Sequence, residues 1–249
     1  MRKWTLLAAA LLAGCAAPPV TSVPDEGDRQ RARVFTELAG AYFARGQYKI
    51  ALDELRKAIT VDNRYGPAYN LYGQIYMELA EDRVAEDNFR RAIDLDRNDS
   101  AARNNYGWFL CTRGRYDEGL EQFRLALANP LYARPEQAMA NAGLCAERKG
   151  DPALAEANLQ KSLKLQPDNP NTLLKLAGLY LRQDRLAEAR QLLARHAELA
   201  VPTAESLWLG VRLERKRGDR AQEAAYGLQL RKNFPDTEET KRLLRGQYE

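Results

Sequence analysis

A segment of about 34 residues repeats along the chain, and this period constrains the fold more than any other feature. The stretch VFTELAGAYFARGQYKIALDELRKAITVD from Val34 returns 34 residues later as AYNLYGQIYMELAEDRVAEDNFRRAIDLD from Ala68. The pattern starts again at Ala102, at Ala138 after a two-residue insertion, and at Thr172. Each copy contains two stretches with helical apolar periodicity. The period therefore indicates a stacked array of helical hairpins, each burying its apolar face against its neighbours.

Small residues recur at two fixed positions of each unit. Two helices that cross closely need small side chains at the crossing, because a larger one would overpack the contact by about 1–3 kcal/mol. The eighth position holds Ala39, Gly73, Gly107, Gly143 and Ala177, and the twentieth holds Ala51, Ala85, Gly119, Ala155 and Ala189. This pattern resembles the tetratricopeptide repeat.

The resemblance predicts an all-α fold, a right-handed superhelical solenoid of six repeats plus a C-terminal capping helix. The solenoid would span residues 32–249. We place the repeats at 32–65, 66–99, 100–135, 136–169, 170–203 and 204–237, and the capping helix at 238–249. The sixth unit fits least well: it matches only with a one-residue shift that puts Ala224 and Leu228 in the twentieth and twenty-fourth positions. Terminal repeats are often atypical, because one of their faces lacks a neighbour.

The N-terminus has the features of a bacterial lipoprotein signal. A basic start, a short apolar run and the lipobox LAGC at Leu12–Cys15 predict a signal peptide over 1–14 and lipidation of Cys15. The alternative is an ordinary secretory signal with a chance cysteine. Ala16 stands where an aspartate would favour the inner membrane, so we expect the periplasmic face of the outer membrane. The Pro-rich stretch that follows predicts a flexible tether within residues 15–31.

Charge and motif content exclude several classes of function. Cleavage after residue 14 would remove Arg2 and Lys3, which lowers the formal charge from +4 to +2. The sequence carries no basic stripe or DNA-binding motif, so we expect no nucleic-acid partner. His196 is the single histidine and stands at a packing position. The sequence contains no recognisable catalytic set, phosphate loop or metal-ligand cluster. We therefore predict a non-enzyme with no catalytic residues, metal, cofactor or small-molecule substrate.

Two cysteines remain once Cys15 carries lipid. Cys111 and Cys145 each lie late in the first helix of adjacent units, and such helices pack side by side in this kind of array. In an oxidising compartment they could form a disulfide bridging the third and fourth units. The alternative is a pair of reduced, buried thiols that act as small apolar side chains.

Asparagines gather where the first helices of a tetratricopeptide array face the concave groove. Asn70 and Asn104 hold the fifth position of their units, Asn105 and Asn141 the sixth, and Trp108 the ninth. An amide can donate and accept, so it can bind the backbone of an extended peptide whatever its sequence, and a flat aromatic adds contact area. These five residues are our candidate partner-binding groove. The alternative is that they are solvated or bond to local backbone.

A second candidate contact surface lies in the first two units. Aromatic residues are dense there, and most of them fall on expected packing positions. Phe43, Tyr65 and Tyr69 do not, so they are free to contact a partner. Core packing is the alternative for these three as well.

One block of the sequence is more specific than the repeat itself. The stretches NNYGWFLC from Asn104, ALANPLY from Ala126 and NAGLCA from Asn141 resemble the PilF/PilW family of type IV pilus biogenesis lipoproteins. General tetratricopeptide proteins do not share this block. The resemblance covers the whole chain after the signal peptide, and Trp108 departs from the smaller apolar residue of many relatives.

The resemblance implies that the chain is a pilotin. Such a protein binds the pilus secretin subunit and promotes its outer-membrane localisation and multimerisation. The implied partners are the secretin, the outer membrane through the acyl chains, and the lipoprotein-sorting machinery. The rival hypothesis is a lipidated scaffold for outer-membrane protein insertion or cell-wall machinery, against which the NPLY block argues.

Overall fold

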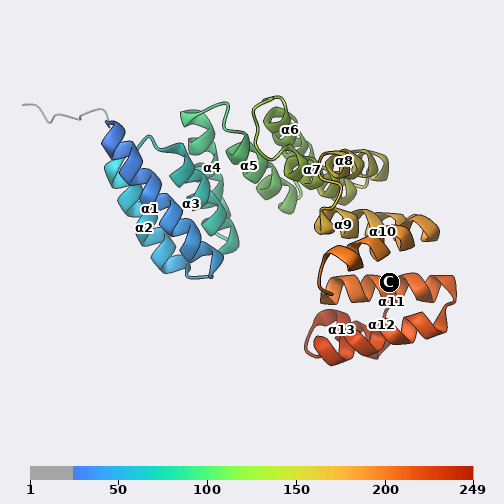
Figure 1. Cartoon of the computed structure of the whole chain (residues 1–249). Helices are drawn as coiled ribbons and strands as arrows, with labels where there is room; N and C mark the ends of the chain where they lie inside the picture. Colours follow the sequence, from blue (N-terminus) through green and yellow to red (C-terminus); the bar gives the residue numbers. More distant parts are fainter. Residues whose placement is uncertain (1–24, 249) are drawn as a thin grey trace, which may run out of the picture.

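The chain folds into consecutive helical hairpins. The computed structural model describes residues 25–248, which contain thirteen α-helices and no strand (Figure 1). The first six are α1 (Glu26–Ala44), α2 (Tyr48–Val61), α3 (Gly66–Glu78), α4 (Asp82–Leu95), α5 (Ser100–Thr112) and α6 (Tyr116–Leu127). The others are α7 (Pro135–Lys149), α8 (Pro152–Leu165), α9 (Pro170–Arg182), α10 (Leu186–Leu199), α11 (Ala204–Arg217), α12 (Arg220–Asn233) and α13 (Glu238–Arg245).

Side-chain caps and left-handed turns set the limits of these helices. Asp99 and Asp151 each accept the backbone N–H three residues on, which satisfies a donor that the first helical turn leaves free. Glycines with positive φ, such as Gly114 at 77°, close most of the first helices. Ala80 and Asp184 replace that glycine in the second and fifth units. They take the same conformation, with φ of 58° and 56°.

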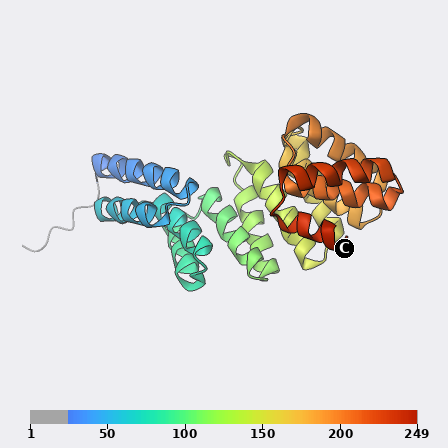
Figure 2. The same cartoon turned by 90° about the horizontal axis from the view of Figure 1, so that it is seen from below.

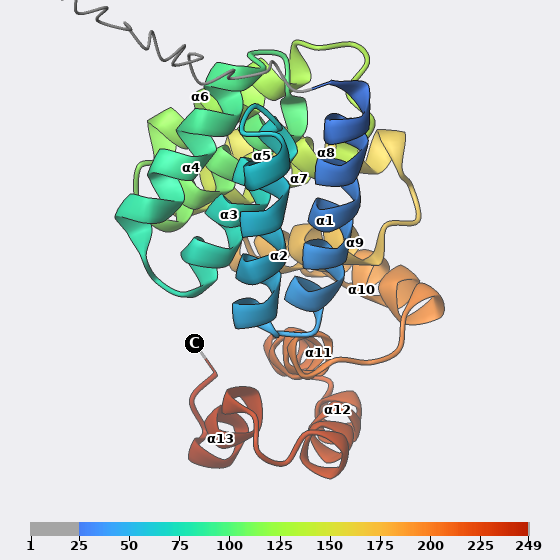
Figure 3. The ribbon, with the colours of Figure 1, turned by 90° about the vertical axis from the view of Figure 1, so that its left-hand side faces the viewer.

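The hairpins stack into one curved array. Each first helix contacts the next first helix, from α1 through α3, α5, α7 and α9 to α11, and we call the face that these helices form the inner face. Each second helix packs against the first helix of the following unit. The helix axes rotate along the array, and α1 and α13 lie at opposite ends (Figures 1 and 2). Viewed from the α1 end, the hairpins wind around the array axis (Figure 3). The predicted all-α superhelical fold is confirmed.

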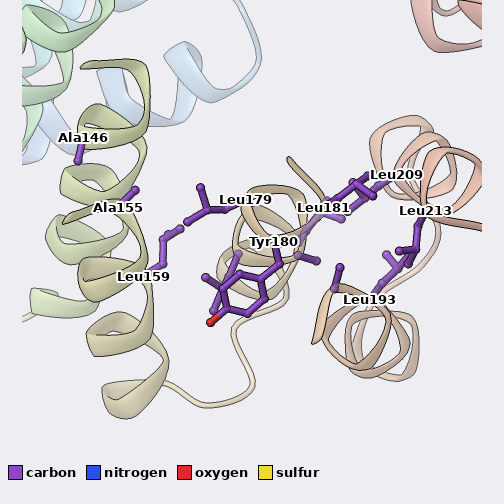
Figure 4. Packing of buried hydrophobic residues seen from close by; sticks show 13 residues of the cluster. Ala146, Ala155, Leu159, Leu179, Tyr180, Leu181, Leu193, Leu209 and Leu213 are labelled. Carbon is purple, nitrogen blue, oxygen red and sulfur yellow. The ribbon is translucent and has the colours of Figure 1, made fainter. Parts of the chain in front are cut away.

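The core is a series of small clusters between neighbouring units. Tyr180 and Leu181 of α9 lie between Leu159 on one side and Leu209 and Leu213 on the other (Figure 4). Four of these clusters are shared by two or three units, as a quasi-one-dimensional array requires, and the last joins the sixth unit to the segment that contains α13.

Two boundaries differ from the prediction. Residues 26–31, expected in the tether, are the first turns of α1, because Asp25 and Asp28 form a reciprocal capping box that starts the helix at Glu26. The predicted signal peptide, Cys15 and the first part of the tether lie outside the described residues. At the other end, the capping helix stops at Arg245, where Gly246 turns with a φ of 68°.

The predicted shift of the sixth unit is wrong. Ala224 is exposed and Leu228 is 59% exposed, so neither packs at the helix crossing. Tyr226 lies there instead, against Gly210, where an added Cβ would come within 2.8 Å of its ring. Counted from Ala204, the helix crossing therefore lies one residue earlier than the eighth and twenty-fourth positions, and not one residue later. The absence of a side chain at Gly210 leaves the space that the tyrosine ring fills. Between residues 25 and 248, no helix combines the length and apolarity that crossing a bilayer requires.

Candidate protein-binding face

Four asparagines form one hydrogen-bonded chain across three units of the inner face. Asn141 Nδ2 on α7 donates to Asn104 Oδ1 on α5 over 3.0 Å, and Asn104 Nδ2 donates to Asn105 Oδ1 over 3.3 Å. Asn105 Nδ2 then donates to Asn70 Oδ1 on α3 over 3.1 Å. The amides all point the same way, so each bond polarises the next. We call these four residues the asparagine chain.

The asparagine chain divides into a buried middle and accessible ends. Asn104 is only 2% exposed, so its amide cannot reach a partner and its expected place in the groove is wrong. Asn104 lies between two neighbouring first helices and connects Asn141 on α7 to Asn105 on α5. Asn70, Asn105 and Asn141 are half-buried. Within residues 25–248, the Asn70 amide nitrogen and the Asn141 amide oxygen make no further hydrogen bond.

A disulfide and an aromatic lie beside this chain. Cys111 and Cys145 are joined as a disulfide between α5 and α7, with Cα atoms 5.6 Å apart. The two cysteines belong to a buried cluster with Phe123 and Ala142. Trp108, one turn beyond Asn105, is half-buried and packs against this cluster. The guanidinium carbon of Arg148 lies 4.8 Å from the Trp108 ring centroid, a cation–π contact. Trp108 is thus a fixed platform on the inner face.

The three aromatic residues of the second candidate surface do not form one exposed patch. Tyr65 lies near the charges of Arg33 and Glu37 in the middle of α1, and burial raises the pKa of its hydroxyl. Phe43 lies at the C-terminal end of that helix, against Tyr48. Both rings are partly buried against the core cluster of α1, α2 and α3, as the core-packing alternative expects. Tyr69 donates its hydroxyl to the carbonyl of Asn63 at 3.0 Å, so it is tied to the turn that precedes α3.

The single histidine has a structural contact. His196 is buried in α10, and its Nδ1 lies 3.0 Å from the carbonyl oxygen of Pro170. A carbonyl only accepts, so Nδ1 carries the proton and the bond ties α10 to the start of α9. Across the described part of the chain, no group of three or more His, Cys, Asp or Glu side chains could hold a metal ion.

A further set of inner-face residues was missed in the sequence. Trp208, Arg212 and Arg215 lie on α11 of the sixth unit, and the last described residue, Tyr248, packs on them. Trp208 lies two residues before the crossing glycine Gly210, as Asn105 and Asn141 lie two residues before Gly107 and Gly143. The weak match of this unit to the repeat hides that correspondence in the sequence.

Known proteins resemble this chain in sequence and structure. Models described as tetratricopeptide repeat match residues 66–99, 88–121 and 147–206. The type IV pilus assembly protein PilF of Pseudomonas aeruginosa is 30% identical over 211 residues, which cover 85% of this chain and 84% of that protein.

Two solved structures also resemble this chain. A Pseudomonas aeruginosa PilF structure superposes with a TM-score of 0.77 at 29% identity, covering 89% of this chain and all of that one. The crystal structure of PilW, described as a widely conserved type IV pilus biogenesis factor, superposes with a TM-score of 0.79 at 32% identity. The match covers 86% of this chain and 99% of PilW. The repeats, the all-helical array and the length of these matches lead to one conclusion: the chain belongs to the PilF/PilW family of tetratricopeptide-repeat proteins of type IV pilus assembly.

Proposed function

We propose that this chain is an outer-membrane lipoprotein that acts as a pilotin. It binds the pilus secretin through its inner face, directs the subunit to the outer membrane and promotes its multimerisation. The observation that carries the proposal is the match to PilF over 85% of the chain, which makes this a pilus assembly protein. The lipobox at Leu12–Cys15 supports the membrane anchor.

Binding rather than chemistry accounts for this activity. A tetratricopeptide array presents a long, rigid surface on which a peptide can lie extended. The acyl chains on Cys15 would fix the complex to the membrane, since each buried CH₂ contributes about 0.8 kcal/mol. Lipoprotein-sorting machinery would then carry the chain and its bound secretin together.

The ends of the asparagine chain suit a peptide backbone. Asn70 offers an amide N–H and Asn141 an amide oxygen, so one end donates and the other accepts. The buried Asn104 holds Asn141 directly and Asn70 through Asn105, which reduces the entropy lost when a partner binds. Trp108 adds a flat apolar surface that Arg148 keeps in position.

A pull-down from membrane extracts tests the binding face. The double variant Asn105→Ala/Asn141→Ala should retain tenfold less secretin on the mature protein than the wild type, with unchanged helix content by circular dichroism. The matched control is Asn88→Ala/Asn158→Ala, whose amides each bond only to a carbonyl one turn back on their own second helices. Equal retention by both variants would show that the asparagine chain is not the contact. Barrel-assembly subunits or murein enzymes in place of secretin would favour the scaffold hypothesis.

A second variant tests the anchor. Cys15→Ala removes the thiol that carries lipid, so the protein should become soluble in the periplasm and secretin multimers should leave the outer membrane. Membrane fractionation followed by immunoblotting for heat-stable multimers measures both. Unchanged multimers in the outer membrane would refute the anchoring step.

A further inference from the structure

The end of the chain folds back onto the inner face of the sixth unit. The Tyr248 ring stacks on Trp208, with centroids 5.8 Å apart and planes 18° apart. The guanidinium carbon of Arg215 lies 3.8 Å from the centroid of the same tyrosine ring. Arg212 Nε donates to the backbone carbonyl of Tyr248 over 2.8 Å. One aromatic side chain and its backbone are thus held by three residues of α11.

These contacts have the form of peptide recognition. An aromatic side chain between an indole and a guanidinium gains stacking and cation–π energy, and a hydrogen bond to the main chain fixes its register. Trp208 precedes the crossing glycine Gly210 by two residues, as Asn105 and Asn141 precede Gly107 and Gly143 in earlier units. It therefore has the same place on the inner face as those two asparagines. The tail therefore lies where a partner peptide would lie.

Arg215 is paired with Glu223 at 2.9 Å, whereas Arg212 has no ion-pair partner among the described residues and supplies the positive charge of the site. Burial, together with the nearby Arg182 and Arg242, lowers the pKa of the Arg212 guanidinium. An added carboxylate would offset this repulsion. Trp208 belongs to a core cluster with Val211 and Leu230, and Tyr248 is one of the residues that pack against this cluster and leave the indole 6% exposed. The site is thus filled while Tyr248 is in place.

We infer that Trp208, Arg212 and Arg215 form a binding site for an extended acidic segment that carries an aromatic side chain, and that Tyr248 fills this site in the free protein. We call these three residues the aromatic site. Tyr248 comes three residues after α13 ends, so its effective concentration at the site is on the order of millimolar or higher. A partner must compete with this tail. The apparent affinity of the partner equals its intrinsic affinity multiplied by the fraction of time that the site is open.

A titration with the chain's own tail sequence tests the inference. The probe is the acetylated tripeptide Gln-Tyr-Glu, which copies residues 247–249, and the readout is the indole N–H resonance of Trp208 in the mature full-length protein. Tyr248→Ala should open the site and bind the tripeptide at least tenfold more tightly than the wild type does. Tyr248→Phe keeps the ring and should behave like the wild type.

Three controls make the outcome decisive. A tripeptide with alanine in place of tyrosine should not bind. Tyr248→Ala/Arg212→Gln keeps the Trp208 resonance and should bind the tripeptide at least tenfold more weakly than Tyr248→Ala does, while keeping its helix content. Raising the salt from about 50 to 300 mM should weaken binding several-fold, because the Arg212 charge is involved. Equal affinity in the wild type and Tyr248→Ala would overturn the inference. The inference would also be overturned if Tyr248→Ala bound wild-type chains and did not bind the tripeptide. The site would then be a contact between two copies of the chain. Because the probe is not a pilus protein, this test is independent of the proposed function.

Discussion

Asn104 shows at the scale of one residue how an inner-face position acquires its role. The sequence places it beside Asn105, and both look equally free to contact a partner. The structure buries Asn104 between α5 and α7, where its oxygen and its nitrogen are both hydrogen-bonded. A buried amide with partners on both sides is stabilising, whereas removing it leaves those partners unpaired. Asn104 therefore sets the geometry of its neighbours and does not itself bind.

Asn104→Ala should destabilise the protein by about 1–3 kcal/mol, because it leaves the amides of Asn105 and Asn141 short of a partner. Urea unfolding followed by circular dichroism measures the change. The surface variant Asn88→Ala should cost less than about 0.5 kcal/mol. Equal losses in the two variants would contradict a structural role for the buried amide.

Gly107 tests the helix crossing that defines each repeat. A Cβ at this position would come within 2.9 Å of the Gly119 carbonyl oxygen and 3.0 Å of the Phe123 ring, so Gly107→Ala should cost about 1–3 kcal/mol. Gly40 lies in α1, where the nearest atom to an added Cβ is 3.9 Å away on Leu71. Gly40→Ala should therefore stabilise by up to about 1 kcal/mol. Thermal unfolding of both variants gives the sign, and a neutral Gly107→Ala would count against close crossing.

The spacing of small residues was enough to predict these crossings, because overpacking there is costly in any such array. The exposure of each asparagine could not be predicted in the same way. It depends on how far one first helix is displaced relative to the next, and a hydrogen bond between Asn104 and Asn141 fixes that displacement. Positions in a repeat specify a face, whereas contacts between units decide which residues on that face stay accessible.

At the scale of elements, the disulfide constrains two neighbouring first helices. It joins residues 34 apart in sequence and so closes a loop containing most of the third unit. In the chain-entropy account, a loop of this length stabilises the fold by about 3–4 kcal/mol. Cys111→Ala/Cys145→Ala should show this loss, and a reductant should cause the same loss in the wild type only. Urea unfolding with and without reductant measures it, and a wild type that releases two thiols without losing stability would contradict the account.

Charged contacts also join consecutive units, and they predict the response to acid. Arg115 bonds to Glu86 of the preceding unit at 2.8 Å, and Arg185 bonds to Glu156 in the same way at 2.8 Å. Burial acts to raise the pKa of Glu86, but hydrogen bonds from Arg115 and Tyr106 outweigh it, so that pKa lies below its ordinary value of 4.5. For Glu156 the bond to Arg185 is the largest cause, and that pKa is also lowered.

Since the folded pKa values lie below the unfolded ones, the stabilisation is fully present above about pH 4.5 and is lost as pH falls through the lowered values. Both pairs are partly exposed, so solvent screening keeps the contribution of each one small. Glu86→Gln/Glu156→Gln should therefore be less stable than the wild type at pH 7, and the two should converge near pH 3. Urea midpoints across this range test the sign, and a constant difference between the two proteins at every pH would be inconsistent with it.

At the scale of the whole molecule, the repeat specifies the array but not its two ends. The interior units follow from the 34-residue period, since each packs against similar neighbours. At the N-terminus the Asp25–Asp28 capping box extends α1 into the expected tether. At the C-terminus Tyr226 fills the crossing of the sixth unit and Tyr248 covers Trp208. End units lack one neighbour, so local residues replace its contacts, and a period carries no information about such replacements.

We expect the inner face of this array to hold another polypeptide during pilus assembly. Site-specific photo-crosslinking in cells that assemble pili tests it most directly, with the crosslinker placed at Asn105 on the inner face or at Asn158 on the outer helix α8. We expect a crosslink to the secretin subunit from Asn105 and none from Asn158. Crosslinks to the secretin from Asn158 alone would contradict it.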